Sequence, residues 1–317
     1  MGWRSLEERH GFAGTLRRLG GGLGGHVGAP QLRMNAVPAP EFVAIGHVTL
    51  DRFGGEVRPG GAALYAALTA DRLGLSAGIL TSHADDFPLD LIPPRIEVVS
   101  VPAPATTVFE HHVTDDEREM RVLSAAAPLG EADVPEDWRD AGLVLLAPVI
   151  NEVDARLAAA FGDASVAAEA QGWLRGLGRD GAVRTVRWET ATQALRSLQA
   201  LFLSASDVRG QESAMTEWVQ RVPIAVVTAG RDGALLYVNG ERYEVRARRA
   251  LEVDPTGAGD VFAATFLARY RRDADPWDAA EAATCAASLS VEGVGWSAVP
   301  DAAGLQAALK DYRTALP

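Results

Sequence analysis

The sequence predicts an α/β fold of three layers, in which helices cover both faces of a mostly parallel central sheet. Short, mainly apolar runs are typical of strands buried on both faces, and such runs occur at 42–48, 76–82 and 141–149. An Ala- and Leu-rich segment between glycines, at 60–74, separates the first two runs and is expected to be a helix. Alternating strands and helices favour a parallel sheet with helices on both sides.

The remaining elements continue this pattern toward the C-terminus. "TTVFEHHVT" and "REMRVLSA" flank the turn "DDE" and predict a β-hairpin, and Asn239-Gly240 marks a second tight turn. Two amphipathic segments are expected to close the domain as helices. The expected further strands are 96–102, 200–206, 224–230 and the pair within 233–247, and the expected helices are 152–161, 258–272 and 276–292.

The first 40 residues differ from the rest of the chain. They contain five arginines against two glutamates and the glycine-rich stretch "GGGLGG". We interpret 1–40 as a flexible N-terminal extension, or as sequence upstream of a start near Met34; a short helix at 5–18 docked on the domain is the alternative. Residues 41–317 are expected to form a single domain.

The composition of the chain argues against some classes of protein, namely general nucleic-acid binders and membrane-spanning proteins. The chain has 317 residues, 48% hydrophobic and 23% charged, which is ordinary for a globular protein. The net charge of −12 argues against a general nucleic-acid binder, and no apolar run has the length of a membrane span. A single cysteine, Cys285, excludes an internal disulfide and fits a cytoplasmic location. We therefore expect no nucleic acid and no membrane as partners; composition leaves a monomer and a homodimer open, and the small-molecule partner follows from the motifs below.

Lysine usage excludes two ways of holding ATP. The only lysine is Lys310, near the C-terminus. A Walker A loop needs a Gly-Lys pair, and protein kinases need a lysine on a strand. Any nucleotide phosphates must therefore be held by backbone N–H groups and arginine.

The stretch "DPTGAGD" at 254–260 precedes an amphipathic segment. A helix that starts near Gly257 leaves its first N–H groups unpaired, which makes an anion site. The negative charge of Asp260 in the first turn partly cancels that anion site, which is an unfavourable arrangement unless the acid has a function. Accepting a proton from a hydroxyl that attacks phosphorus is such a function. Simple capping of the helix is the alternative reading of a single Asp at this position.

Three motifs resemble the ribokinase/PfkB carbohydrate kinase family. "DPTGAGDVFAATFL" is similar to its C-terminal signature D-T-x-G-A-G-D, "GGAALYAALTADRLG" to its N-terminal glycine-glycine helix, and "GHVTLD" to its first strand. The resemblance covers about residues 41–317. It implies a ribokinase-like three-layer sandwich with a small β-lid, and ATP-dependent phosphorylation of a hydroxyl with Mg²⁺.

The resemblance also implies roles for individual residues. Asp260 would be the catalytic base, beside an anion hole of backbone N–H groups and a phosphate-contacting Thr256. The segment "VVTAGRDGALL" resembles the family's nucleotide segment, and the helix around Ala283–Ser288 would line the adenine pocket. The implied residues are Gly257, Ala258 and Gly259 for the anion hole, Asp51, Gly60, Gly61 and Tyr65 for substrate, and Thr228, Gly230 and Gly233 for ATP.

The chain departs from the family pattern at several places. Tyr65 stands where many members have Asn, and Ser204 and Asp207 replace the N-x-x-E element linked to Mg²⁺ and phosphate. Asp207 would hold the metal through water, or would instead cap the next helix. Gln171 and Arg175 would touch substrate or phosphate, with a solvated Arg175 as the alternative. The lid looks reduced, near 51–60 and 105–124, and the hairpin at 106–124 is expected to be all of it.

The histidines show no metal-ligand spacing, and at most one of His111 and His112 is expected to face the site. The sequence thus predicts a phosphotransferase with an alcohol acceptor, a kinase for a sugar or cyclic polyol, with some likeness to the inositol-kinase branch. A nucleoside kinase of the adenosine type is the alternative. A catalytically weak ligand-binding or regulatory member of the fold is the alternative from a different class.

Overall fold

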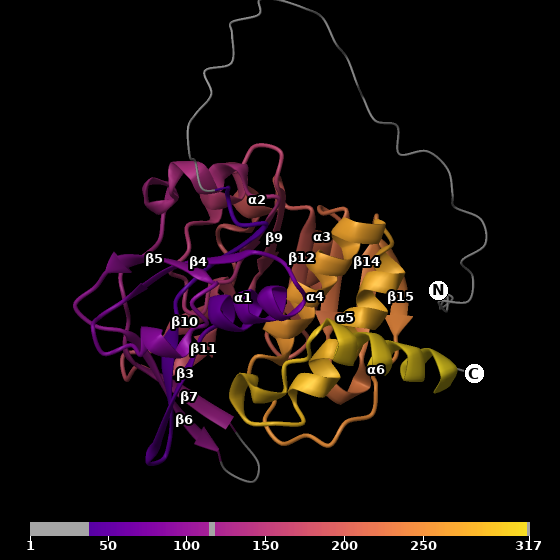
Figure 1. The fold of residues 1–317 in the computed structure, drawn as a ribbon. Helices are drawn as coiled ribbons and strands as arrows, with labels where there is room; N and C mark the ends of the chain where they lie inside the picture. The colour runs from indigo at the N-terminus through magenta and orange to yellow at the C-terminus, as the bar shows by residue number, and fades with distance from the viewer. Residues whose placement is uncertain (1–37, 114–117, 316–317) are drawn as a thin grey trace, which may run out of the picture.

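The computed structural model describes residues 38–113 and 118–315, so the expected extension at 1–40 falls almost wholly outside the described part. A nine-stranded sheet runs through the molecule in the order β15-β14-β13-β12-β9-β8-β1-β4-β5 (Figure 1). The strands from β13 to β5 are mutually parallel, and β14 and β15 add an antiparallel edge. The strands are β1 (Phe42–Ile45), β4 (Ala77–His83), β5 (Glu97–Pro102), β8 (Leu143–Leu146), β9 (Ser165–Glu169), β12 (Ala200–Ser204), β13 (Ile224–Thr228), β14 (Ala234–Val238) and β15 (Glu241–Val245).

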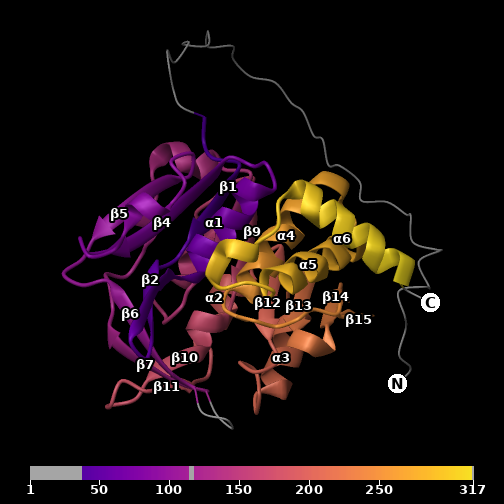
Figure 2. The same ribbon diagram turned by 60° about the horizontal axis from the view of Figure 1, so that its bottom comes forward.

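Helices cover both faces of this sheet, so the predicted three-layer α/β fold is confirmed (Figures 1 and 2). One face packs against α1 (Ala62–Arg72), α4 (Ala258–Asp273) and α5 (Pro276–Ser290), with α6 (Ala302–Ala315) packed on α5. The other face packs against α2 (Ala191–Leu195), α3 (Glu212–Val219) and several 3₁₀ turns. Both cores form because apolar strand residues alternate between the two faces.

The central strand β1 illustrates the alternation. Phe42 and Ala44 face the α1, α4 and α5 layer, whereas Val43 and Ile45 face the opposite layer. All four side chains are fully buried. The uniformly apolar run at 42–45 therefore reports a strand covered on both faces, as the sequence predicts.

The helix pair α4 and α5 positions the N-terminus of α4 at the strand ends. The apolar stripe of α4 packs Phe262 and Phe266 edge-on against Phe202 of β12. The helix ends at Asp273, and the capping residue Ala274 has a positive φ of 51°. Helix α5 begins directly afterwards, because the Asp275 carboxylate accepts hydrogen bonds from the Trp277 and Asp278 N–H groups. This tight connection fixes the direction of α4 over the sheet.

A second, four-stranded sheet forms the lid, in the order β3-β2-β6-β7 (Figure 2). Its strands are β2 (Thr49–Phe53), β3 (Glu56–Gly60), β6 (Thr107–Val113) and β7 (Arg118–Ser124). The expectation that the hairpin at 106–124 is the whole lid is wrong, because residues 49–60 pair as another hairpin. A short ribbon of β10 (Arg175–Leu177) and β11 (Val183–Thr185) lies against β7 through a bridge between Arg121 and Ala182.

Two helix predictions need correction. The helix expected at 152–161 is only a 3₁₀ turn, Ala155–Ala159, which starts where the Asp154 side chain accepts a hydrogen bond from the Arg156 N–H. The two expected closing helices are followed by a third, α6, whose buried residues Leu305, Leu309 and Tyr312 recur at helical spacing. No helix in the described residues is long and apolar enough to cross a membrane.

Candidate active site

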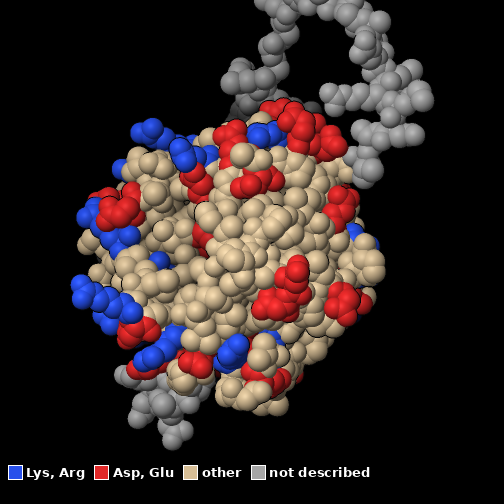
Figure 3. Space-filling view, turned by 90° about the vertical axis from the view of Figure 1, so that its left-hand side faces the viewer, with Lys and Arg blue, Asp and Glu red and all other residues tan. Residues whose placement is uncertain are grey.

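A large pocket opens at the carboxyl ends of the parallel strands, where open α/β sheets bind ligands. Its volume is about 1280 Å³, and it lies between the lid, α1, the N-terminus of α4 and α5. Figure 3 shows one face of the molecule, on which basic side chains lie mainly along the left-hand edge and acidic side chains mainly at the top and right. Almost all of the residues predicted for the site line this pocket. They are Asp51, Gly61, Tyr65, Gln171, Arg175, Ser204, Asp207, Thr228, Gly230, Gly233, Thr256, Gly257, Ala258, Gly259 and Asp260.

The start of α4 has the geometry of an anion site. Gly257 has a φ of 79°, a conformation that glycine adopts without strain, and the helix N-terminus has no side-chain cap. The Thr256 hydroxyl is buried without a hydrogen-bond partner in the described residues. The Ala258 N–H donates to the Pro255 carbonyl at 3.3 Å, so it is less available to a ligand than the expected three-amide hole requires.

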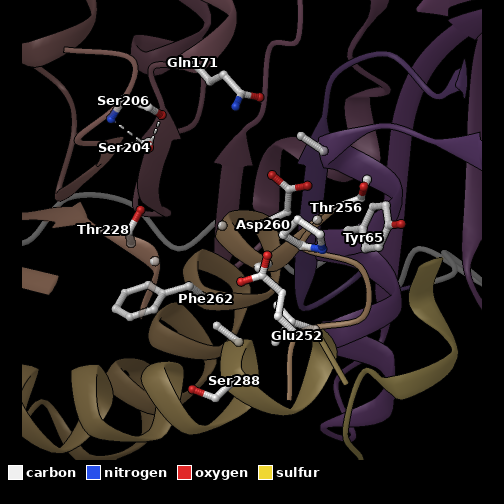
Figure 4. Close-up of a pocket in the computed structure, with 18 of the residues that line it drawn as sticks. Tyr65, Gln171, Ser204, Ser206, Thr228, Glu252, Thr256, Asp260, Phe262 and Ser288 are labelled. Carbon is white, nitrogen blue, oxygen red and sulfur yellow. Dashed lines mark hydrogen bonds between the residues drawn. The ribbon is translucent and has the colours of Figure 1, made fainter. Parts of the chain in front are cut away.

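Asp260 points from the first turn of α4 into the cavity, with Thr256 and Tyr65 to one side and Ser204, Ser206 and Thr228 across from it (Figure 4). Its pKa is raised to about 7, chiefly because burial penalises the charged carboxylate. A hydrogen bond with Glu169 and the charge of Arg175 oppose this rise, and the charge of Asp51 adds to it. A carboxyl group with a pKa near neutrality is suited to accept a proton.

Glu169 is a site residue that the sequence reasoning missed. It is the last residue of β9, only 7% exposed, and hydrogen-bonds with Asp260. Burial and the neighbouring Asp260 raise its pKa well above the ordinary value. An acid at the end of an otherwise apolar strand, directly before "AQGWLR", is the signal that could have identified it.

The lid side of the pocket presents a carboxylate and an imidazole. Asp51 on β2 is 7% exposed and accepts a hydrogen bond from the Thr49 hydroxyl at 3.2 Å. The His111 ring lies 3.7 Å from the Asp51 carboxylate and stacks on Phe53 at 4.5 Å between centroids. His111 therefore faces the site and was undervalued from the sequence. Gly60 packs behind Asp51, since a Cβ there would lie 2.4 Å from Asp51 Oδ2.

Tyr65 supports the anion site as well as lining the pocket. A Cβ added to Gly257 would lie 2.2 Å from Tyr65 Cδ1, so the ring packs directly on the Gly257 backbone. The ring also meets Trp296 edge-on at 6.2 Å, and burial raises the pKa of the phenol. The substrate contact predicted for Tyr65 is thus accompanied by a packing role, which explains why a bulky ring stands at this position.

Three polar side chains meet across the pocket from α4. Arg175 donates to the Val149 carbonyl at 3.2 Å and acts electrostatically on both Asp207 and Asp260. Burial raises the pKa of Asp207, while Arg175 and a hydrogen bond with Gln171 lower it. Asp207 does not cap the next helix, because α3 starts at Glu212 with Gln211 at its N-cap. Arg175 is half-buried, begins strand β10 and lines the pocket.

The structure brings no ready-made metal cluster together: the described residues contain no group of three or more His, Cys, Asp or Glu side chains that could hold a metal ion. Asp207 nevertheless presents a carboxylate to the pocket. Mg²⁺ is usually held by one or two carboxylates together with water and substrate phosphates, so a single carboxylate here fits that mode.

The far end of the pocket is built from backbone and small residues. Gly233 has a φ of 93°, and a Cβ there would lie 2.2 Å from the Val245 carbonyl oxygen, so only glycine fits. Helix α5 contributes Thr284, Ala287 and Ser288. Four arginines border this end, namely Arg231, Arg246, Arg248 and Arg249. Of these, Arg248 forms an ion pair with Glu292 at 3.0 Å and Arg231 forms one with Glu252 at 3.9 Å.

Asp254 ties the lid to the start of α4. Its Oδ2 accepts from Arg58 of the lid at 3.3 Å and from the Gly295 N–H at 3.0 Å. Its Oδ1 accepts from the Thr256 N–H at 3.0 Å. The first acid of "DPTGAGD" therefore shapes the turn and connects it to β3, a role that the sequence pattern did not specify.

Comparisons with known proteins agree with this geometry. Residues 198–302 match the sequence profile described as "pfkB family carbohydrate kinase". The resemblance to the ribokinase/PfkB family is therefore confirmed. The chain is 26% identical to cytidine kinase from Thermococcus kodakarensis over 73% of its own length and 89% of that protein. It is 31% identical to inositol 3-kinase from Oryza sativa subsp. japonica, over 65% of its own length and 56% of that protein.

Solved structures support the fold of the family. A pyrophosphate-dependent kinase in the ribokinase family superposes with a TM-score of 0.71 at 22% identity, covering 84% of this chain and 99% of that one. The nucleoside kinase of Methanocaldococcus jannaschii gives 0.69 at 21% identity, covering 87% and 100%. These likenesses confirm the predicted ribokinase-like fold. The family match and the kinases among the similar proteins support the predicted enzyme class, a phosphotransferase with an alcohol acceptor.

Proposed function

We propose that the protein transfers the γ-phosphoryl group of ATP to a hydroxyl of a sugar or cyclic polyol. The observation that carries this proposal is the position of Asp260, which lies inside one continuous pocket between a lid-side end rich in polar side chains and an end large enough for a nucleotide. A base at that junction is where an acceptor hydroxyl and a donor phosphate would meet.

The acceptor end offers several groups that can bind hydroxyls. Asp51 presents a carboxylate, His111 an imidazole and Gln171 an amide, and together they can accept and donate several hydrogen bonds. A molecule with many hydroxyls matches this set. The inositol 3-kinases and the cytidine kinase among the similar proteins mark the two acceptor types to compare.

A nucleoside is the second candidate acceptor, on a specific observation. Phe109, His111 and Met120 form an aromatic and apolar wall on the lid side of the pocket, against which a base could stack. The polar groups named above would then bind the ribose hydroxyls. Turnover measured side by side on polyols and on nucleosides decides between these two acceptor classes.

The donor end favours a nucleotide over pyrophosphate. The pocket continues past the phosphate region along Ala247, Ala250, Ala287 and Val291, a small and apolar surface that suits a flat base. Pyrophosphate needs no such extension. Because the chain has one lysine, Lys310, which does not line this pocket, the phosphates would be held by the α4 N-terminus, Thr256 and the arginines.

In the proposed reaction, the acceptor oxygen attacks the γ-phosphorus while its proton moves to the Asp260 carboxylate. The new O–P bond forms as the bond to the β,γ-bridging oxygen breaks, and ADP leaves. The N–H groups at the start of α4 and the Arg175 guanidinium stabilise the charge on the transferring group. Mg²⁺ would neutralise donor phosphate charge, with Asp207 holding it through water. A cytoplasmic location stays a prediction.

The test is phosphate-ester formation measured by ³¹P NMR. The panel is ribose, fructose, myo-inositol, adenosine, cytidine and fructose 6-phosphate, each with MgATP and, separately, with magnesium pyrophosphate. We expect ADP and one new ester from a sugar or polyol. Turnover only with pyrophosphate would contradict the donor assignment, and turnover only on nucleosides would favour the second acceptor class. Binding of ATP and an acceptor without turnover would favour a ligand-binding protein.

A further inference from the structure

The buried glutamate beside the base has no part in the mechanism described so far. Strand β9 alternates in the usual way: Val166 and Ala168 belong to one core, whereas Ala167 belongs to the core under α4. Glu169, two residues after Ala167, lies on that same α4 face. Its strand partner Phe202 packs edge-on against Phe262 of α4. Glu169 is therefore an acid placed in apolar surroundings beneath the first turn of α4.

The Glu169 carboxyl group has few hydrogen-bond partners for a buried acid. One carboxyl oxygen, Oε2, is buried and has no hydrogen-bond partner among the described residues. Among the described residues, the side chain that hydrogen-bonds with the Glu169 carboxyl group is that of Asp260. Two carboxylates can share a hydrogen bond only if one of them carries a proton, and two adjacent buried charges are strongly unfavourable.

The neighbouring charges decide which of the two carries the proton. Asp260 is faced by Arg175 from the segment after β9, by Asp51 from the lid, by Tyr65 from α1 and by Glu169. The positive charge of Arg175 acts on Asp260, whereas the influences on Glu169 are burial and Asp260 itself. The pKa of both acids is raised, and Arg175 limits the rise only at Asp260, so the shared proton is held more readily by Glu169 than by Asp260.

We propose that Glu169 is a positioning residue that carries a proton at rest and donates it in a hydrogen bond to the Asp260 carboxylate. This bond holds Asp260 at the pocket wall and keeps it ionised, so that it can take the acceptor's proton. Glu169 itself does not touch the reacting atoms. The inference rests on the proposed function of Asp260 as the base. Its structural basis is the hydrogen-bonded pair of Glu169 and Asp260.

Two substitutions of similar volume separate hydrogen bonding from packing. Glu169→Gln keeps a donor for Asp260 and is neutral at every pH. Glu169→Met fills the space without a donor, so the pKa of Asp260 should rise. We expect the acid limb of the kcat/KM profile to stay near its wild-type position in Glu169→Gln. In Glu169→Met it should move up by about one pH unit, which is about a tenfold loss of kcat/KM on that limb. Identical profiles for the two variants would overturn the proposal.

A spectroscopic measurement tests the protonated glutamate without turnover. In the full-length protein at pH 8, the infrared spectrum should contain the stretching band of a protonated, buried carboxyl group. The band should be absent in Glu169→Gln and present in Asp260→Asn. If the wild-type band is missing, or survives in Glu169→Gln, the proposal is wrong even if the enzyme is active. If the band behaves as expected but no acceptor is phosphorylated, the proposed function fails and the proton-sharing pair stands.

Discussion

The acceptor end and the donor end of the pocket differ in the kind of groups that line them and in how far those groups are exposed to solvent. At the acceptor end, the functional groups are side chains on strands and the first turn of α4: Asp51 and Glu169 are each 7% exposed, and the half-buried Asp260 is hydrogen-bonded to Glu169. At the donor end, they are backbone at Gly230 and Gly233 and exposed arginines such as Arg249. The acceptor end concentrates desolvated charge, whereas the donor end offers shape and solvent-screened charge.

This difference suits the acceptor end to the chemical step and the donor end to binding of the phosphoryl donor. Burial is what raises the pKa of Asp260 toward neutrality and makes it useful as a base. Exposed charges interact weakly because water and salt screen them, so the arginines at the donor end steer and hold phosphates. Substitutions at the acceptor end should therefore change kcat, and substitutions at the donor end should change the donor KM.

The largest effect is expected for Asp260→Asn. The amide keeps the shape and cannot accept the proton, so kcat should fall by about 10²–10⁴-fold while ATP binding persists. Steady-state kinetics and ATP titration calorimetry measure the two quantities. The same chemical change at the donor end, Asp232→Asn, is the matched comparison and should leave kcat nearly unchanged. Comparable losses of kcat in both variants would contradict the division between the two ends.

A smaller effect is expected at the wall shared by the two ends. In Gly257→Ala the new Cβ meets the Tyr65 ring at 2.2 Å and the residue keeps a positive φ, which should destabilise the fold by about 1–3 kcal/mol. Gly259→Ala is the control, since a Cβ there has nothing within 4 Å. Urea unfolding compares them. Equal unfolding free energies would show that the contact between Tyr65 and Gly257 does not constrain the turn.

The smallest effect is expected at the donor rim. Arg249 is exposed and lines the pocket, so Arg249→Ala should raise the ATP KM by about fivefold or less, with kcat unchanged. The exposed Arg196, outside the residues that line this pocket, provides the control variant Arg196→Ala. The increase should shrink at high salt. A salt-independent fall in kcat would show that Arg249 acts in the chemical step instead of in ATP binding.

The fold and most of the pocket lining could be predicted because they depend on local patterns. Apolar runs identified β1, β4 and β8, and the "DPTGAGD" motif located Gly257 and Asp260. The lid hairpin at 49–60 was missed although its two-residue turn, Gly54-Gly55, is a local signal of such a hairpin. The 3₁₀ turn at 155–159 has a helix-like composition. Glu169, His111 and Arg58 could not be placed because their roles depend on partners far away in the sequence: Asp260, Asp51 and Asp254.

The pH dependence of kcat/KM for the best acceptor, in wild type and Asp260→Asn, tests the central claim most directly. The base acts only when deprotonated, so wild-type kcat/KM should be full above a pKa of about 7 and fall about tenfold per pH unit below it. Asp260→Asn should retain a low rate without this acid limb. The same acid limb in both proteins would show that another group takes the acceptor's proton.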